Sequence, residues 1–196
     1  MKVLVACEFS GVVREAFAAR GHDAMSCDIL PTDIPGQHYQ GDVMDIINDG
    51  WDMMIAHPPC THLAVSGARH FAKKRADGRQ QEGINFFMEM INAPIDKIVV
   101  ENPVGIMSTI YKKPSQIIQP WQFGHEASKS TCLWLKGLPL LTPTNIVDKG
   151  EFVTFKSGKR MTKWYADAAH KPPKEREKIR NTTFQGIADA MAEQWG

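Results

Sequence analysis

The stretch KVLVACEFSGVVREAFAARG, residues 2–21, predicts one strand followed directly by one helix. Residues 2–7 are a nearly continuous apolar run, which is typical of a strand buried in a parallel sheet. Residues 11–20 carry apolar side chains at helical spacing, and Gly21 suits the position after a helix. A strand that turns at once into a helix is the first half of a βαβ unit. The stretch therefore predicts an α/β protein with a parallel sheet.

The rest of the chain continues this alternation up to residue 100 and then changes. The strands expected in the first half are residues 23–28, 52–57 and 95–100. The helices expected there are residues 43–48 and 80–92, the second of which ends before Pro94. The elements expected later are strands at 116–124 and 129–137, a hairpin at 152–164 that turns at Ser157 and Gly158, and a closing helix at 183–195. Residues 170–178 fit either a linker or a helix start.

Length and composition are those of an ordinary globular domain. A chain of 196 residues with 43% apolar side chains can bury one core. The apolar start of the chain is too short for a signal peptide, and no later run reaches the ~18 apolar residues of a membrane span, so we expect a cytoplasmic protein without a membrane partner. The cysteines contain no CxxC pair, which favours reduced thiols over disulfides or structural zinc.

Charge is distributed unevenly along the chain. Residues 22–52 carry seven Asp and neither Lys nor Arg, whereas residues 151–180 carry nine basic and four acidic side chains. This asymmetry is consistent with an acidic face for a cationic small molecule and a basic face for phosphates. Scattered, solvated charge explains it equally well.

Three expected strand ends have unusual sequences: CEFSG at 7–11, HPPC at 57–60 and VENP at 100–103. Ligands of open parallel sheets collect outside the carboxyl ends of the strands. The three segments should therefore line one edge.

The CEFSG turn and two aspartates are candidates for binding a nucleotide-like group. Gly11 would let a ligand approach the start of the helix, although an ordinary strand-to-helix turn has the same sequence. Asp28 lies 17 residues beyond Gly11, near the spacing at which an acid meets a ribose hydroxyl. Asp42 could hold an adenine amino group or cap the helix that follows it.

HPPC and VENP supply the reactive groups. Two prolines fix the backbone before Cys60 and so aim its thiol, which suits addition to C6 of a pyrimidine; the plain alternative is a buried cysteine after a turn. Glu101 ends an apolar strand, where a carboxylate is costly without a partner. It could hydrogen-bond N3 and the amino group of a cytosine, or satisfy loop backbone donors.

These motifs, in this order, resemble those of the DNA cytosine-5 methyltransferases. The carriers of the resemblance are FSG at 9–11, the acid that ends the second strand, GDV at 41–43, PPC at 58–60, ENP at 101–103 and FQGIADAMA at 184–192. More closely, the chain resembles the small cytosine-methyltransferase-like proteins of bacteriophages and prophages. The resemblance implies a Rossmann-like class I fold that uses S-adenosylmethionine, with a mostly parallel seven-stranded sheet, helices on both faces and a small hairpin appendage.

The resemblance also assigns roles to individual residues. Cys60 would attack C6 of cytosine in DNA, Glu101 would bind N3 and the amino group, and C5 would take the methyl group. The positions implied beside the cofactor are Phe9, Gly11, Pro58, Asp28 at the ribose and Asp42 at the adenine. No metal is implied.

The chain departs from the family where it would contact DNA. Val13 replaces a second glycine of the cofactor turn, and Lys129 is the nearest counterpart of the paired arginines beside the target base. Residues 1–196 are expected to form a single domain, in which the insert at 141–180 replaces a full recognition domain. Basic side chains that could grip phosphates are Lys73, Lys74, Arg75 and Arg79 in a mobile loop and Lys156, Lys159, Arg160 and Lys163 on the hairpin. Little sequence recognition is expected unless a protein partner supplies it.

Three other functions compete with DNA methylation. A zinc cytidine deaminase is disfavoured because its PC-x-x-C and upstream H-x-E are missing around Cys60. A non-catalytic phage factor that binds S-adenosylmethionine or nucleic acid, for regulation or counter-defence, would need no recognition domain. Modification of a free pyrimidine nucleotide or a single strand would retain the chemistry and suit a small recognition element.

Overall fold

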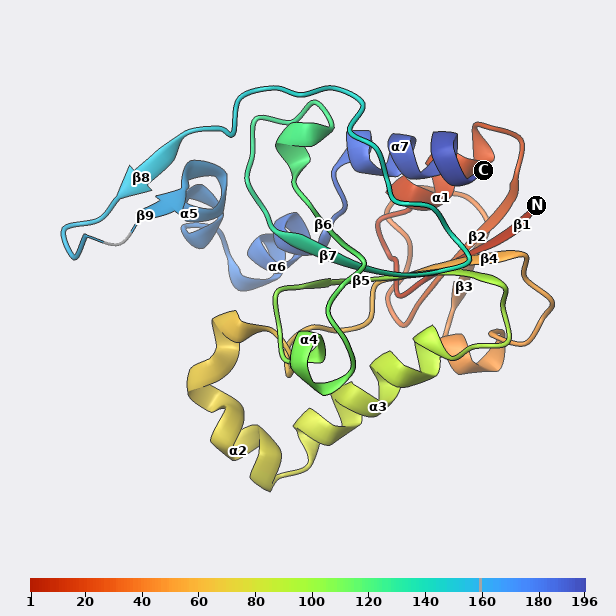
Figure 1. Ribbon diagram of the computed structural model, residues 1–196, viewed down its shortest axis with the longest axis horizontal. Helices are drawn as coiled ribbons and strands as arrows, with labels where there is room; N and C mark the ends of the chain where they lie inside the picture. Colours follow the sequence, from red (N-terminus) through yellow and green to blue (C-terminus); the bar gives the residue numbers. More distant parts are fainter. Residues whose placement is uncertain (159) are drawn as a thin grey trace.

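A seven-stranded sheet forms the centre of the computed structural model, which describes residues 1–158 and 160–196 (Figure 1). Its strand order is β3-β2-β1-β4-β5-β7-β6. The strands are β1 (Lys2–Ala6), β2 (Asp23–Asp28), β3 (His38–Gln40), β4 (Met53–Ala56), β5 (Lys97–Pro103), β6 (Gln116–Ile118) and β7 (Thr131–Lys136). Neighbours from β3 to β5 are parallel, whereas β7 is antiparallel to both β5 and β6. The expected mostly parallel sheet is confirmed.

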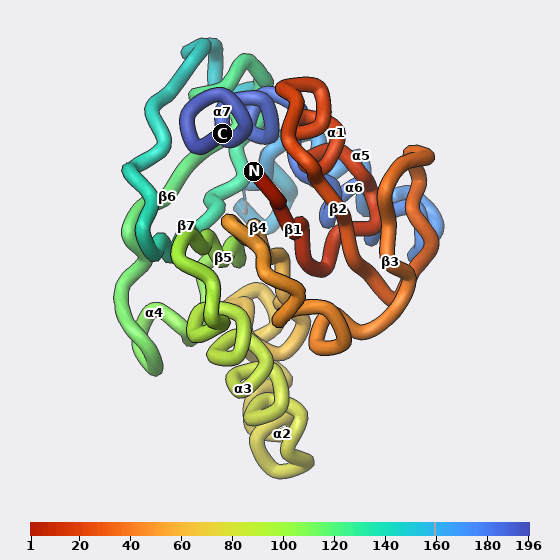
Figure 2. Tube along the Cα trace, turned by 90° about the vertical axis from the view of Figure 1, so that its right-hand side faces the viewer, coloured from red at the N-terminus to blue at the C-terminus, as the bar shows by residue number. Residues whose placement is uncertain are grey.

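Helices cover both faces of this sheet. The α-helices outside residues 151–181 are α1 (Val12–Ala18), α2 (Phe71–Ala76), α3 (Arg79–Ile91), α4 (Met107–Ile110) and α7 (Gln185–Trp195). Figures 1 and 2 show α1 and α7 together on one side of the sheet and α3 with α2 on the other. The closing helix therefore packs beside the first helix.

Side chains along the central strands point alternately to the two faces of the sheet and so form two separate hydrophobic cores. Val3 and Val5 of β1 are fully buried against α1 and α7. Leu4 and Ala6, the residues between and after them, are fully buried in the core that contains α3. Because successive strand side chains point to opposite faces, a strand covered on both sides must be apolar at every position. This explains the unbroken apolar run that begins the sequence.

The basic part of the chain forms a small subsidiary unit. Its elements are β8 (Phe152–Thr154), β9 (Arg160–Thr162), α5 (Lys163–Ala169) and α6 (Pro173–Asn181). Strands β8 and β9 pair antiparallel in a sheet of their own. The hairpin is thus shorter than expected, since the chain becomes helical at Lys163. Of the two alternatives for residues 170–178, the helix start is correct, with Pro173 in the first turn, where its missing N–H costs nothing.

Three other expectations require correction. The helix expected at 43–48 is only a 3₁₀ turn, Val43–Asp45. The strand expected at 116–124 stops at Ile118, because Pro120 cannot donate to a ladder and instead begins a 3₁₀ turn. The basic stretch expected to be a loop is helical over α2. Within residues 1–158 and 160–196, no helix is both long and apolar enough to cross a membrane.

Candidate active site

The ends of β1, β4 and β5 lie side by side, since these strands are neighbours in the sheet. The backbone N–H of His57, just after β4, donates to the carbonyl of Ala6 at 2.9 Å. The side chain of Asn102 is buried and donates from Nδ2 to the carbonyl of Pro58 at 2.8 Å. This bond joins the HPPC segment to VENP. Asn102 therefore fixes the position of the proline turn relative to Glu101.

Cys60 opens a tight turn directly after the two prolines. Its carbonyl accepts from the backbone N–H groups of Leu63 and Ala64, both at 2.9 Å. The side chain is half-buried, and burial raises the pKa of its thiol, as does the negative charge of Glu101; the charge of Lys129 acts in the opposite direction. In this conformation Cys60 is a thiol at neutral pH, so attack requires a change in its surroundings.

Glu101 lies where β5 leaves the core, with 19% of its side chain exposed. Burial raises the pKa of its carboxyl group, but a hydrogen bond from His57 and the positive charges of Lys129 and His57 outweigh it, so the net pKa is lowered. Nδ1 of His57 lies 3.2 Å from Oε2 of Glu101. At neutral pH Glu101 is thus a carboxylate, which can accept hydrogen bonds but cannot donate one.

Lys129 precedes β7 and is half-buried, so it is not an exposed surface lysine. Its Nζ donates to the carbonyl of Arg180 at 2.8 Å, in the last turn of α6. The guanidinium of Arg180 in turn lies over the ring of Tyr165 in α5, 3.7 Å from the centroid. Lys129 therefore connects the basic unit to the surroundings of Glu101.

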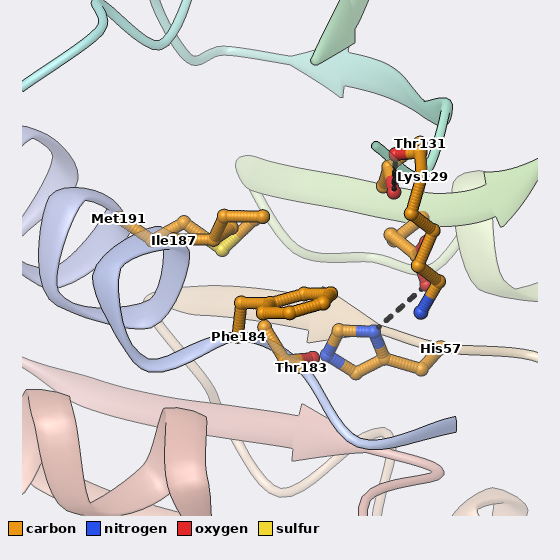
Figure 3. Close-up of a pocket in the computed structure, with 8 residues that line it drawn as sticks. His57, Lys129, Thr131, Thr183, Phe184, Ile187 and Met191 are labelled. Atoms are coloured by element: carbon orange, nitrogen blue, oxygen red, sulfur yellow. Dashed lines mark hydrogen bonds and ion pairs between the residues drawn. The ribbon is translucent and has the colours of Figure 1, made fainter. Parts of the chain in front are cut away.

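A small pocket lies beside Glu101 (Figure 3). Its lining residues are His57, Glu101, Lys129, Thr131, Thr183, Phe184, Ile187 and Met191. Its free volume for the centre of a water-sized sphere is about 10 Å³, room for about one water molecule. Phe184, at the start of α7, is held there by Trp164, whose ring lies 5.6 Å away edge to face. A pyrimidine ring does not fit unless these side chains move.

The turn at the end of β1 is covered by the chain itself. Gly11 is buried with φ of 75° and precedes α1. A Cβ at this position would lie 2.7 Å from Nη2 of Arg14 and 3.1 Å from Cβ of Ile34. The backbone N–H of Asp33 donates to the carbonyl of Phe9, itself half-buried, at 2.8 Å. The loop after β2 thus closes over the glycine turn, where the sequence predicted that a ligand would approach.

Two buried charges hold this covered turn together. Glu8 is 4% exposed and accepts from the backbone N–H groups of Val13 (2.7 Å) and Arg14 (3.2 Å), so a carboxylate from this chain occupies the start of α1. Arg14 is fully buried and donates to Ser26, Thr32 and the carbonyl of Ile34.

Asp28 and Asp42 meet around Cys7 at the ends of β1 and β2. Burial raises the pKa of Asp28, although a backbone N–H from Leu30 at 2.9 Å counteracts it. Asp42 is exposed and caps the 3₁₀ turn by accepting from the N–H of Met44 at 3.0 Å. Burial, and after it the charges of Asp28, Cys27 and Asp42, raise the pKa of Cys7. The backbone N–H of Gly41 donates to the carbonyl of Asp28 at 3.0 Å, which brings the two aspartates to the same strand end. Paired carboxylates of this kind can accept from the hydroxyl and amino groups of an adenosine, so they fit that ligand, although the glycine turn beside them is closed.

The candidate phosphate contacts differ in exposure. Lys73 and Arg75 are exposed on α2, but Lys74 is buried and its Nζ donates to the carbonyl of Thr61, which leaves it facing inward. Lys156 and Arg160 are exposed beside and on the hairpin. Arg160 stacks over Phe152, 4.2 Å from the centroid, and Lys159 lies outside the described residues. The described part of the chain holds no group of three or more His, Cys, Asp or Glu side chains that could bind a metal ion.

The sequence analysis did not identify four residues that organise these sites: His57, Asn102, Glu8 and Arg14. His57 and Asn102 belong to the HPPC and VENP segments, but the sequence predicts no role for either side chain. A charged residue inside an apolar turn, as at Glu8 and Arg14, was the available signal for a buried network.

No family model matches the sequence, and no curated protein matches it. Chains of solved structures do match. One is a crystal structure described as that of a candidate DNA modification methyltransferase encoded within a prophage (E. coli), with a TM-score of 0.51, 19% sequence identity and 88% of this chain covered. This chain spans 55% of the length of that chain. The fold is the Rossmann-like fold of methyltransferases.

Proposed function

We propose that the protein transfers a methyl group from S-adenosylmethionine to C5 of cytosine in DNA. The observation that carries the proposal is that Cys60 and Glu101 stand at the ends of the adjacent strands β4 and β5, in two segments that the bond from Asn102 to Pro58 ties together. A thiol and a carboxyl group that converge at one mouth can engage opposite edges of a single pyrimidine. The fold shared with a methyltransferase encoded in a prophage supports the proposal.

In this reaction the chain's own residues bind and activate the base. The Cys60 thiol loses its proton to water and its sulfur forms a bond to C6, while Glu101 binds the N3 and amino edge and stabilises the electron pair that moves onto the ring. S-adenosylmethionine supplies an electrophilic methyl group. A base or water then removes the C5 proton, and Cys60 is eliminated. Asp28 and Asp42 are the proposed contacts to the ribose and adenine, with Phe9, Gly11 and Pro58 nearby.

The proposed DNA contacts lie on either side of this mouth. Lys73 and Arg75 on α2, and Lys156 and Arg160 at the hairpin, are exposed and can bind phosphates, which position nucleic acid without reading its sequence. A protein partner is the proposed source of any further recognition. Lys74 and Lys129 are better explained as supports, because both ammonium groups bond to backbone carbonyls.

Two observations support a second candidate, a non-catalytic factor that binds S-adenosylmethionine or nucleic acid. The pocket beside Glu101 has room for about one water molecule, and the pKa of Cys60 is raised rather than lowered. An enzyme with this structure must open the pocket when its substrate binds. A binding factor need not.

The deciding experiment measures transfer of labelled methyl groups. The purified protein is incubated with labelled S-adenosylmethionine and, separately, duplex DNA, single-stranded DNA, RNA and dCMP. We expect transfer to duplex DNA, and its loss in Cys60→Ser, a variant of nearly equal size that should still bind the cofactor. If methyl groups are transferred only to single-stranded nucleic acid or to dCMP, that molecule and not duplex DNA is the substrate. Cofactor binding without any transfer would establish the binding factor instead.

A covalent trap tests the step at C6 separately. DNA that contains 5-fluorocytosine has no removable proton at C5, so the adduct to Cys60 should persist when cofactor is present. The expected result is a shifted band that contains protein and DNA and that Cys60→Ser abolishes. If the fluorinated DNA binds but no adduct forms, addition at C6 is ruled out.

A further inference from the structure

His57 is the one side chain in the described ranges, 1–158 and 160–196, recorded as hydrogen-bonding to the carboxyl group of Glu101. Its ring is 12% exposed and lines the pocket beside Glu101 (Figure 3). Nδ1 lies 3.2 Å from Oε2 of Glu101, and since a carboxylate only accepts, we assign the hydrogen of this bond to Nδ1. Nε2 is buried and has no hydrogen-bond partner among those residues. This arrangement leaves one ring nitrogen bonded to Glu101 and the other without a partner in the described residues.

A cytosine requires more from Glu101 than a carboxylate can give. The amino group of cytosine donates, and one carboxylate oxygen can accept from it. N3 of cytosine is an acceptor, so the other oxygen must carry a hydrogen to bind it. Glu101 lacks that hydrogen at neutral pH, because its pKa is held low. Binding of cytosine at this carboxyl group must therefore bring a proton to it.

The charged and titratable groups around Glu101 come from three directions. His57 follows β4 and bonds to it; Cys60 follows the same strand; Lys129 lies before β7. Glu177 of α6 acts on Cys60. The ammonium group of Lys129 bonds to the carbonyl of Arg180, and the Cys60 thiol is itself held protonated by burial. Histidine is the side chain that ordinarily exchanges a proton between pH 5 and 8, and here only His57 is bonded to Glu101.

We infer that His57 is the positioning residue of Glu101: it orients the carboxyl group beside Cys60 and carries the proton with which Glu101 binds N3 of a cytosine. The inference rests on the proposed function. In the step itself Nε2 first takes a proton from water, which makes the ring an imidazolium; the Nδ1–H bond then breaks and an O–H bond forms on Glu101, leaving His57 neutral with its hydrogen on Nε2. The proton returns when the base leaves, so no other reactant is consumed.

The same transfer prepares the nucleophile. A protonated Glu101 is neutral, so it no longer opposes ionisation of the Cys60 thiol. Binding of the correct base thus removes one of the three causes, burial, Glu101 and Glu177, that raise the pKa of Cys60. A uracil can give its N3–H to one oxygen of the ionised carboxylate, but its O4 is an acceptor that would face the other oxygen, so it neither fits this edge fully nor removes that charge.

The test of positioning requires no substrate. Alkylation of Cys60 by iodoacetamide is followed against pH by mass spectrometry of the peptide that contains it, in the wild type, Glu101→Gln, His57→Ala and His57→Asn. Glu101→Gln should move the alkylation profile to lower pH. His57→Ala should move it in the same direction, because the carboxylate is released, while His57→Asn should restore the wild-type profile, since an asparagine amide places an N–H near the position of Nδ1. An unchanged profile in His57→Ala would overturn the positioning role.

The test of proton transfer compares kcat/KM for cytosine methylation across pH in the wild type and His57→Asn. The asparagine keeps the hydrogen bond but does not titrate, so Glu101 must take its proton directly at its own low pKa. We expect the loss of kcat/KM at high pH to begin at lower pH in His57→Asn, with a deficit of roughly 10²-fold at pH 7 that narrows on acidification. A deficit equal at every pH, or none, would overturn the proton-carrying role.

The alkylation experiment and the kcat/KM experiment together distinguish a failure of this inference from a failure of the proposed function. If no cytosine substrate is methylated or bound, the proposed function fails and the proton-carrying role fails with it, but the alkylation profiles still decide whether His57 positions Glu101. If methylation occurs and the profiles of wild type and His57→Asn coincide, the function stands and the proton-carrying role falls.

Discussion

Two candidate sites lie at the carboxyl edge of the sheet. Both lie at the ends of parallel strands, but different parts of the chain cover them. At the end of β4 and β5, His57 and Glu101 line a small pocket that Phe184 from α7 also lines, and Cys60 follows His57 three residues later. At the end of β1 and β2, Gly11 is covered by the loop after β2, while Asp28 and Asp42 remain near the open edge. Each site has polar side chains that suit a ligand. In each, other residues of the chain cover the space beside these side chains.

The two sites differ in the groups that cover them. The pocket near Glu101 is closed by apolar side chains at the start of α7, which can move without breaking hydrogen bonds. The turn at Gly11 is closed by a network around a fully buried arginine, Arg14, and by the backbone bond from Asp33 to Phe9. Opening the first site costs packing; opening the second also leaves polar groups unpaired. We therefore expect the β4–β5 site to open more readily.

The largest effect should come from Arg14→Ala. The substitution removes the bonds of the guanidinium to Ser26, Thr32 and the carbonyl of Ile34, each worth roughly 1 kcal/mol, and leaves a cavity where a fully buried side chain stood. We expect the free energy of unfolding to fall by about 4 kcal/mol in urea titrations, with faster amide exchange over residues 29–37. Arg20→Ala, in an exposed arginine at the end of the same helix, is the control and should change stability by less than about 0.5 kcal/mol. Equal effects of the two would show that the β1–β2 edge is not held by Arg14.

A smaller loss is expected for Gly11→Ala, and Gly21→Ala is its matched control. Both glycines have positive φ, 75° and 82°, so alanine costs roughly 1–2 kcal/mol at either position. At Gly21 no atom lies within 4 Å of the added Cβ, whereas at Gly11 it meets Arg14 and Ile34. Overpacking there should add about 1–3 kcal/mol, measured as the difference between the two urea midpoints. Identical midpoints would mean that the loop moves aside freely.

The smallest effect is a pair of opposite pH dependences. The pKa of Glu101 lies below its usual 4.5, so its contribution stabilises the fold at neutral pH and is lost as pH falls through the folded-state value. The pKa of Asp28 lies above its usual 3.8, chiefly through burial, so its charge weakens the fold at neutral pH, and this cost disappears on acidification.

Urea midpoints from pH 7 to pH 3 test both signs. Glu101→Gln should be less stable than the wild type at pH 7, and Asp28→Asn more stable, with both gaps closing as pH falls. A Glu101→Gln gap that does not change with pH would contradict the role of His57 and Lys129 in holding Glu101 ionised.

Local sequence patterns were sufficient to predict the helices and strands with a strong hydrophobic periodicity and the residues at the ends of the strands. The apolar runs of β1, β4 and β5 and the helical spacing of α3 and α7 indicated the sheet and its layers, because burial on both faces or on one stripe leaves a regular signature. They were insufficient for α2 and α5, which are short, polar and dependent on neighbouring elements. Glu101 and Cys60 could be singled out because each is chemically out of place in its segment; His57 could not, because a histidine after a strand has many ordinary uses.

By itself, the sequence determined that this chain forms a mostly parallel sheet whose strand ends carry a cysteine, a glutamate and the aspartate Asp28. That information is local, since it depends on periodicity and on which residue follows each strand. Only the tertiary structure decided that Glu101 bonds to His57, that Phe184 fills the pocket between distant elements, that Lys74 faces inward and that Gly11 lies under Arg14 and Ile34. These contacts join residues up to more than a hundred positions apart, and their geometry depends on how the layers pack, which no spacing along the chain encodes.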